Sequence, residues 1–359
     1  MNWAKFSRLP EITKSLKQLY GQYGYKPIRL ARFEEYELYL ANKNFLKHGE
    51  VITFMNTDGR LLSLKPDVTL SVIKSVAAQS QSCNQKVFYS DYVYRPSGSS
   101  RSYDEFYQIG LEYIGSIDEY ALAEIAALAA KSLAVISPDY LLELSHVSFV
   151  SGLLDGVDEG LRKEIMACIT AKSLHGLESA LEKVSLDDDT KTKIRMLIEL
   201  GGDFKQTLQS MRGLAINEQM ETAARELETI YRVLERIGLQ DNIKIDFSMI
   251  DDIEYYNGIV LRGYIKEIPT AVLRGGRYDC LVRKQGYSSN AMGFALTLND
   301  IDQKTKSNDS DIDVLIEYDS CDPCLLAETA ERLTAEGKTV RAEKIGTGRD
   351  FTYREVYRI

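Results

Sequence analysis

The sequence has 359 residues, enough for more than one domain, because a single hydrophobic core rarely grows beyond about 250 to 300 residues. Its composition is 44% hydrophobic and 27% charged, and no apolar run approaches the ~20 residues of a membrane span. The first residues also lack the apolar stretch of a signal peptide, so we expect a cytoplasmic protein with no membrane segment. The net charge of −9 argues against a surface built mainly to bind nucleic-acid phosphates.

Cysteines and histidines do not combine into a metal site. The five cysteines are scattered apart from Cys321 and Cys324, whose spacing occurs in metal and redox sites but also at ordinary helix starts. The histidines, His48, His146 and His175, are far apart in the sequence. We therefore expect no metal ion and no cofactor.

The first third of the chain predicts a mixture of helices and strands. Residues 10–23 have apolar positions at helical spacing, with a proline at the start and a glycine just after the end. Residues 25–34 are expected to form a strand or edge segment. Asp58-Gly59 is a hairpin turn signal between two short strands, and residues 67–79 predict a second helix.

Two aromatic and β-branched segments, 86–95 and 103–115, predict an antiparallel hairpin. Ser116 is followed three positions later by Glu119, a capping-box pattern ahead of an Ala/Leu-rich amphipathic helix. That helix should cover one face of the sheet.

The rest of the chain predicts a sheet interrupted by helices. Residues 150 to about 238 have a period near 3.6 and predict an inserted helical subdomain. Strand patterns return over residues 243–250, 258–265, 270–278 and 290–298. We expect a core domain over residues 1–302, a linker over 303–310 and a small α/β appendage over 311–359, with the order strand, helix, strand.

One face of the strand over residues 103–115 carries polar side chains. Alternation places Gln108, Gly110 and Glu112 on that face. The glycine leaves room for a ligand, and Glu112 can accept hydrogen bonds from an ammonium group. The alternative is a wet face on which both polar side chains point to water.

Three other segments carry candidate side chains. Asp67, two positions before Thr69, either caps the following helix or contacts a ligand. Tyr255 and Tyr256 are adjacent, so alternation sends one to each face. The segment RGGRYD, residues 274–279, is too short for a phosphate-binding fingerprint and is more typical of a turn.

Five segments of the sequence resemble the catalytic core of class II histidyl-tRNA synthetases, in order over most of residues 1–302. They are LKPDVT, FYSDYVYRPSGSSRSYDEFYQIGLEYIG, IEYYNGIVLRGY, GGRYDCLVRKQG and AMGFALTLND. The resemblance implies an α+β fold with a six- to seven-stranded antiparallel sheet flanked by helices. It also implies a homodimer formed through the N-terminal helix and strand, where the family's usual proline is Ala31.

The resemblance also assigns roles to single residues. Asp67, Gln108 and Glu112 match the residues that hold the amino group of histidine, Thr69 belongs to the same wall, and Tyr255 and Tyr256 match the lining of the imidazole pocket.

The phosphate-binding residues match only in part. Arg95 corresponds to the arginine that contacts the α-phosphate of ATP, and Arg101 lies in the same loop. Two arginines of the family are replaced by aspartates in this sequence. Asp251 stands at the position of the histidine-specific arginine, and Asp300 stands at the position of the third-motif arginine that clamps ATP. Because losing one preorganised charge typically costs a few kcal/mol of transition-state stabilisation, two reversals predict that no adenylate is formed.

A histidine site without activating cations resembles the regulatory subunits of short-form ATP phosphoribosyltransferase in histidine biosynthesis. The resemblance implies a non-catalytic chain in a hetero-oligomer with the catalytic subunit, required for activity and for feedback by histidine as allosteric ligand. Only half of an anticodon-binding domain follows residue 310, so tRNA binding is not expected. The alternatives are a divergent histidyl-tRNA synthetase or amino-acid-activating paralogue, and a stand-alone histidine-binding protein.

Overall fold

The computed structural model describes residues 8–42, 51–77, 84–96, 102–249, 255–304, 310–347 and 351–359. Most of the expected linker over 303–310 lies outside these ranges. Contacts divide the chain into two compact units, Glu11–Asp300 and a smaller one that contains Ile301–Ile359. None of the helices in the described ranges is long and apolar enough to cross a membrane.

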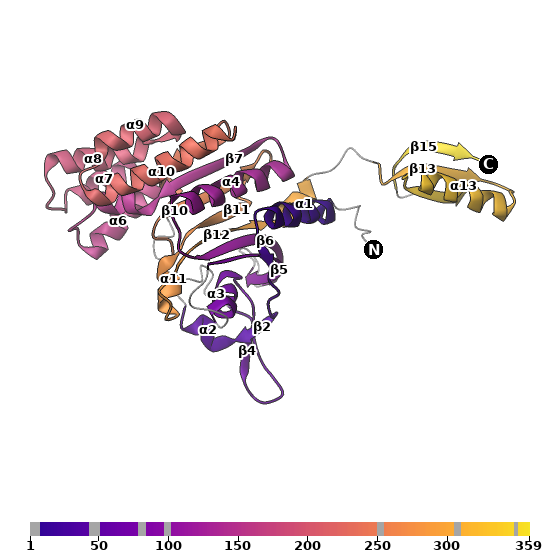
Figure 1. Ribbon diagram of the computed structural model, residues 1–359, viewed down its shortest axis with the longest axis horizontal. Coiled ribbons are helices and arrows are strands. Elements are labelled where there is room, and N and C mark those ends of the chain that lie inside the picture. The colour runs from indigo at the N-terminus through magenta and orange to yellow at the C-terminus, as the bar shows by residue number, and fades with distance from the viewer. Residues whose placement is uncertain are drawn as a thin grey trace. The chain divides into compact units, whose positions relative to one another are not determined.

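A mixed sheet forms the centre of the larger unit, with nine strands in the order β1-β5-β6-β12-β11-β10-β7-β9-β8 (Figure 1). Six neighbours pair antiparallel: β5 (Gln85–Pro96), β6 (Tyr103–Gly115), β12 (Asn290–Thr297), β11 (Leu273–Arg277), β10 (Ile259–Ile265) and β7 (Tyr140–His146). This ladder confirms the predicted hairpin and the antiparallel core.

Short strands make the sheet wider than the resemblance implied. β1 (Lys26–Pro27) extends one edge and pairs parallel with β5. β9 (Ile243–Asp246) pairs parallel with β7, and β8 (Gly201–Asp203) pairs antiparallel with β9 at the other edge. The sequence pattern did not single out β7, which pairs with β10 on one edge and with β9 on the other.

Helices α1 (Leu9–Gln22) and α4 (Glu119–Ile136) lie on the same face of the sheet (Figure 1). The hydroxyl of Tyr20 on α1 lies 3.0 Å from Oγ of Ser132 on α4. The ring of Tyr20 meets that of Phe294 on β12 edge-on, with centroids 6.1 Å apart. The helix predicted over 10–23 and the helix predicted after residue 116 are both present.

The predicted capping box at the start of α4 is wrong. Asp118 is the N-cap, and its Oδ1 accepts a hydrogen bond from the amide of Ala121 at 2.8 Å. Since the helix begins at Glu119, Ser116 lies too early to cap it, and the amide of Ser116 donates instead to Oδ1 of Asn84.

Helices occupy the segment that was predicted to be a helical insertion. They are α5 (Val147–Leu153), α6 (Glu159–Thr170), α7 (Leu174–Leu181), α8 (Asp188–Glu199), α9 (Phe204–Leu214) and α10 (Glu218–Arg236). α10 returns from this group to pack against α4 and α5 (Figure 1). The insertion is therefore attached to the helical layer of the core, and its strand β8 joins the sheet.

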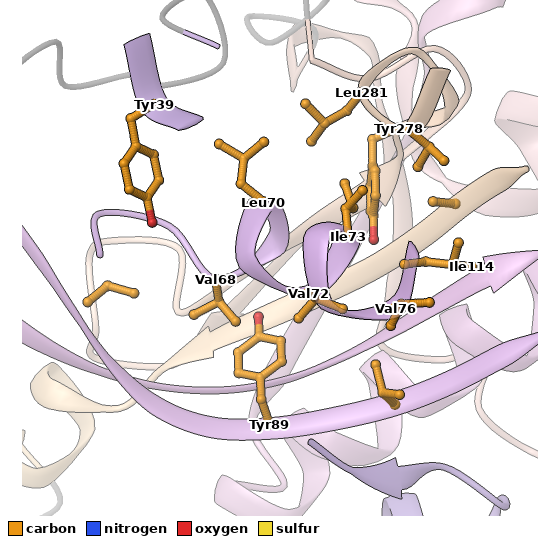
Figure 2. Close-up of a cluster of buried hydrophobic side chains, with 14 residues drawn as sticks. Tyr39, Val68, Leu70, Val72, Ile73, Val76, Tyr89, Ile114, Tyr278 and Leu281 are labelled. Carbon is orange, nitrogen blue, oxygen red and sulfur yellow. The ribbon is translucent and has the colours of Figure 1, made fainter. Parts of the chain in front are cut away.

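The opposite face of the sheet carries α3 (Thr69–Ala77) and α11 (Asp279–Lys284). Figure 2 shows the rings of Tyr89 and Tyr278 pointing toward α3, where they pack with Val72 and neighbouring buried side chains. This cluster packs α3 against the sheet.

A small antiparallel sheet is formed by β2 (Phe33–Glu35), β4 (Leu61–Leu64) and β3 (Thr53–Met55). The short helix α2 (Tyr36–Leu40) directly follows β2 in the chain. The hairpin predicted at Asp58-Gly59 is confirmed, with Gly59 at a φ of 78°. The segment predicted as one strand over 25–34 is instead divided between β1 and β2, which belong to different sheets.

The smaller unit is a three-stranded parallel sheet with β13 (Ile312–Tyr318) between β14 (Val340–Lys344) and β15 (Tyr353–Arg358). Leu333 of α13 (Pro323–Ala335) packs against Val314 and Ile316. The expected strand, helix and strand are present, and β15 is an additional strand.

Candidate functional site

A buried carboxyl group, Glu112 on β6, lies on the sheet face that carries α3. Glu112 is 1% exposed. The hydroxyl of Thr69 donates a hydrogen bond to Oε1 at 2.8 Å, and the hydroxyl of Tyr278 donates to Oε2. Burial raises the pKa of Glu112 to about 8, although both hydrogen bonds act to lower it and the charge of Asp67 raises it further. Glu112 therefore holds its proton at neutral pH until a cation is placed beside it.

Asp67 caps the following helix, which is one of the two roles that its sequence position suggested, while its contact with a ligand stays a prediction. Its Oδ1 accepts a hydrogen bond from the amide of Leu70 at 3.1 Å, which caps α3. It is also close enough to Glu112 to raise the pKa of that group. Burial raises the pKa of Asp67 itself, partly offset by the charge of Arg95. Two carboxyl groups thus face one site, and both are harder to ionise than in water.

Arg95 is held to the same loop. Its Nε donates a hydrogen bond to the carbonyl of Pro66 at 2.8 Å, and its charge acts on Asp67. The arginine that the resemblance assigns to the α-phosphate therefore lies beside Asp67.

Three tyrosines form a wall next to Glu112. The rings of Tyr255 and Tyr256 are 4.6 Å apart, and those of Tyr255 and Tyr278 are 5.9 Å apart. Tyr255 and Tyr256 pack against the same buried cluster, so the prediction that alternation separates them is wrong. They precede β10, and strand alternation does not apply to them.

The sequence reasoning missed Tyr278, because its segment was interpreted as a turn. The available signal was an aromatic residue directly after a glycine pair at a strand end. We call Asp67, Thr69, Glu112, Tyr255 and Tyr278 the Glu112 site.

Glycines let these side chains lie along the sheet. A Cβ on Gly293 would be 1.8 Å from Oε2 of Glu112, so only glycine fits opposite that carboxyl. A Cβ on Gly110 would be 2.6 Å from the hydroxyl of Tyr89. The space above Gly110 that was predicted to admit a ligand is therefore filled by Tyr89.

Gln108 lies on the same face of β6 but further along it. It is 6% exposed, and its Nε2 donates to Oγ1 of Thr297 at 3.1 Å. The alternative of a wet face is wrong for Gln108 and Glu112, since both are buried. Four residues of strand, roughly 13 Å, separate their backbones, so a shared contact with one amino group stays a prediction.

Of the two positions at which the family has an arginine, the structure describes Asp300. Asp300 in α12 (Asn299–Lys304) is exposed, and its Oδ2 accepts a hydrogen bond from the hydroxyl of Thr270 at 3.2 Å. Arg101 and Asp251 lie outside the described residues. Over the ranges that the structure describes, no three His, Cys, Asp or Glu side chains are grouped to bind a metal ion.

Comparison with known families and curated proteins extends the resemblance. A family model described as histidyl-tRNA synthetase matches residues 2–301. The ATP phosphoribosyltransferase regulatory subunit of Oceanobacillus iheyensis is 28% identical over 322 residues, which cover 87% of this chain and 79% of that protein.

Solved structures share the fold. A protein from Bacillus halodurans C, described as an ATP phosphoribosyltransferase regulatory subunit/histidyl-tRNA synthetase, superposes with a TM-score of 0.79 at 24% identity, covering 97% of this chain and 93% of that one. A chain of an ATP phosphoribosyl transferase complex from Thermotoga maritima gives a TM-score of 0.65 at 19% identity, covering 80% and 97%. The class II synthetase-like fold predicted from the sequence is confirmed.

Proposed function

Because this chain belongs to the histidyl-tRNA synthetase family, we propose that it is the non-catalytic regulatory subunit of a short-form ATP phosphoribosyltransferase in histidine biosynthesis. In this proposal it forms a homodimer within a cytoplasmic hetero-oligomer with the catalytic subunit. It is required for activity and for feedback inhibition, with histidine as the allosteric ligand. The name of the Oceanobacillus relative supports this role.

The charge of the site is the observation that carries the proposal. Asp67 and Glu112 are two carboxyl groups whose pKa values are raised by burial, and an ammonium group placed beside them lowers both pKa values and pairs with the carboxylates that form. Asp300 is exposed and stands at the third-motif position where the family binds ATP with an arginine. The arrangement favours an amino acid and disfavours a triphosphate.

Feedback also needs a difference between two states of the complex. Histidine can inhibit only if it binds the inactive assembly more tightly than the active one, with a coupling of typically 1 to 3 kcal/mol. In this proposal the ligand's α-amino group lies between Asp67 and Glu112, and the tyrosines contact its imidazole ring.

The test is formation of phosphoribosyl-ATP by a short-form catalytic subunit from the same source. We expect activity to appear only when this chain is added, and to fall when histidine is added. Activity that is the same with and without this chain would contradict the proposal.

A variant pair tests whether histidine acts through the Glu112 site. Asp67→Asn combined with Glu112→Gln removes both carboxylates that would hold the ammonium group, so the response to histidine should be lost. Asp241→Asn combined with Glu182→Gln makes the same chemical changes at exposed positions and should keep the response. An unaltered response in the first pair would place histidine elsewhere.

A divergent synthetase is the second candidate, and Arg95 is the observation that favours it. Arg95 lies beside Asp67, where it could still bind a phosphate. Histidine-dependent exchange of pyrophosphate into ATP separates the two functions. We expect exchange at background level, whereas a rate above background would support the synthetase. Histidine binding without any effect on phosphoribosyl transfer would instead indicate a stand-alone binding protein.

A further inference from the structure

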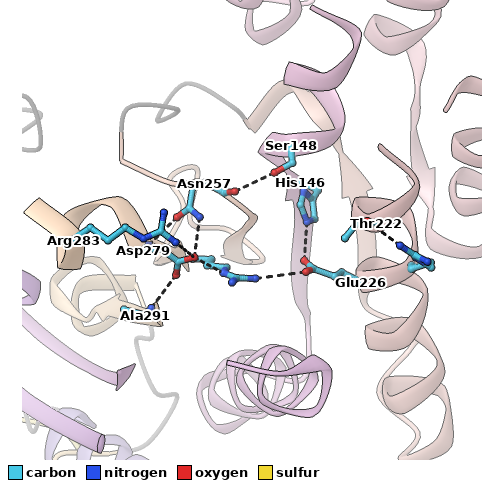
Figure 3. Close-up of polar contacts among 10 residues, drawn as sticks. His146, Ser148, Thr222, Glu226, Asn257, Asp279, Arg283 and Ala291 are labelled. Carbon is cyan, nitrogen blue, oxygen red and sulfur yellow. Dashed lines mark hydrogen bonds and ion pairs between the residues drawn. The ribbon is translucent and has the colours of Figure 1, made fainter. Parts of the chain in front are cut away.

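A second polar network joins the sheet to the helical insertion (Figure 3). Glu226 on α10 contacts two residues of the sheet. Nε2 of His146, at the end of β7, lies 2.9 Å from Oε2 of Glu226. Nη1 of Arg277, at the end of β11, lies 3.5 Å from Oε1. One carboxylate therefore joins the insertion to two strand ends.

Arg277 extends the network to the start of α11. Its Nε lies 2.9 Å from Oδ2 of Asp279, whose side chain is 2% exposed. Nδ2 of Asn257 donates to the same Oδ2 at 3.0 Å, and the amide of Ala291 donates to Oδ1 at 3.0 Å.

Asn257 closes a ring of hydrogen bonds. Its Oδ1 accepts from the amide of Asp279 at 2.7 Å, and its own amide donates to the carbonyl of Arg277 at 2.9 Å. Side chain and backbone of three residues from two segments are thus fixed to one another. We call His146, Glu226, Arg277, Asp279 and Asn257 the Glu226 network.

The protonation of the network follows from its geometry. Burial alone would raise the pKa of Glu226, but the hydrogen bond from His146 and the charge of Arg277 hold it below its ordinary value. A carboxylate only accepts hydrogen bonds, so Nε2 of His146 carries the hydrogen. Nδ1 of His146 is buried and has no hydrogen-bond partner among the described residues, so Glu226 is the polar contact that orients this ring.

The Glu226 network and the Glu112 site share the same short segments of backbone. Tyr278, whose hydroxyl contacts Glu112, lies between Arg277 and Asp279 in the sequence. Tyr255, whose ring lies 5.9 Å from that of Tyr278, is two residues before Asn257. The Glu226 network therefore fixes the backbone on both sides of Tyr278 and just after Tyr255.

We propose that Glu226 is a positioning residue for the Glu112 site. Through Arg277 and Asp279 it sets where Tyr278 stands against Glu112, and so couples ligand binding to the placement of α10. The coupling is reciprocal. If an effector that shifts α10 changes the affinity for the ligand by some factor, the ligand changes the affinity for that effector by the same factor. That the ligand is histidine rests on the proposed function; the positioning itself does not.

Hydrogen exchange on the full chain without ligand tests the positioning directly. Glu226→Gln keeps the shape of the side chain but removes its charge. We expect the amides of Asn257, Asp279 and Ala291 to exchange at least about fivefold faster, because their hydrogen-bond acceptors belong to the network. Unchanged exchange at these three amides would overturn the proposal.

The matched control is Glu228→Gln on the same helix. Glu228 pairs with Arg212 at 2.6 Å on the surface, with side chains 36% and 63% exposed. This variant should leave the three amides unchanged. If Glu226→Gln does not fold, Arg277→Lys serves as the second variant, because a lysine has one shorter point charge in place of the separate guanidinium nitrogens that contact Glu226 and Asp279. It should raise exchange at the same amides, and unchanged exchange there would again overturn the proposal.

Histidine titration then separates positioning from general loosening. Glu226→Gln should weaken histidine binding about five- to tenfold in the wild-type background but less than about twofold when Tyr278→Phe is also present, since neighbours that act through one contact are not additive. Additive losses would overturn the route through Tyr278. Faster exchange at the three amides with no histidine binding to the wild type would support the positioning role and refute the proposed function.

Discussion

The hydroxyl of Tyr278 donates a hydrogen bond to Oε2 of Glu112, although the two residues are 166 positions apart in the sequence. Thr69 supplies a second hydroxyl to the same carboxyl group. A hydroxyl can donate to a carboxylate and can also accept from a protonated carboxyl, so both states of Glu112 have partners. Glu112 can therefore be neutral, and it can become anionic when an ammonium group lies beside it.

The stability of the protein should depend on pH through Glu112. The pKa of this group is about 8 in the folded chain, against an ordinary value of 4.5. Between these values the folded state holds a proton that the unfolded chain has lost, so stability falls as the pH rises through this window. Glu112→Gln removes the titration. It should match the wild type near pH 5 and exceed it by a few kcal/mol above pH 8, at about 1.4 kcal/mol per pKa unit.

Urea unfolding at three pH values across that window measures the effect. Glu182→Gln, at an exposed position, is the control and should follow the wild type at every pH. A difference between Glu112→Gln and the wild type that does not change with pH would show that Glu112 is ionised throughout.

Ligand binding should release a proton from the same group. At pH 7 Glu112 is protonated, and an ammonium group beside it lowers its pKa, so binding of histidine drives the proton off. Affinity should therefore rise with pH between 7 and 8, by at most about tenfold per unit. Calorimetry in two buffers of different ionisation enthalpy counts the protons. No release in the wild type, or equal release in Glu112→Gln, would argue against contact between the ligand and Glu112.

Gly293 should not tolerate a side chain. An added Cβ would meet Oε2 of Glu112 at 1.8 Å and the carbonyl of Leu111 at 2.3 Å, and the backbone carbonyl cannot move without breaking the sheet. We expect Gly293→Ala to lose ligand binding and about 1 to 3 kcal/mol of stability, as overpacking does elsewhere.

Gly213→Ala makes the same chemical change in open space on α9. Because alanine is the better helix former, it should leave binding intact and raise stability by up to about 1 kcal/mol. Denaturant unfolding together with a ligand titration distinguishes the two variants, and a neutral Gly293→Ala would mean that Glu112 can move aside.

The sequence was informative where a local pattern reflects a local cause. Alternation along β6 placed Gln108 and Glu112 on one face, and the position of Asp67 before a helix predicted its cap. The same reasoning failed for Tyr255 and Tyr256, because alternation holds only inside a strand.

Contacts between distant segments left no local signal. Tyr278 reaches Glu112 only because β11 and β6 are both paired with β12. Glu226 reaches Arg277 only because α10 returns to the sheet after the whole insertion. Nothing in either helix or strand pattern marks these partners, so their roles had to come from the folded chain.

The ion pair of the buried Lys65 should be important for stability. Lys65 is 0% exposed, and its Nζ lies 2.6 Å from Oδ2 of Asp91 and donates to the carbonyl of Ala31 at 3.2 Å. Lys65→Met leaves Asp91 without its cation, and breaking such a pair typically costs about 3 to 5 kcal/mol. Because Lys65 is two residues from Asp67, histidine affinity should fall as well.

Two comparisons interpret the result, both measured by urea unfolding. Lys266→Met breaks an exposed pair with Asp139, whose side chains are 69% and 63% exposed, and should cost less than about 1 kcal/mol. Adding Asp91→Leu to Lys65→Met removes the orphaned carboxylate and should recover part of the loss, since apolar replacements of a buried pair are often neutral. If Lys65→Met alone is as stable as the wild type, Asp91 has access to water or to another cation, and the pair does not anchor the loop that carries Asp67.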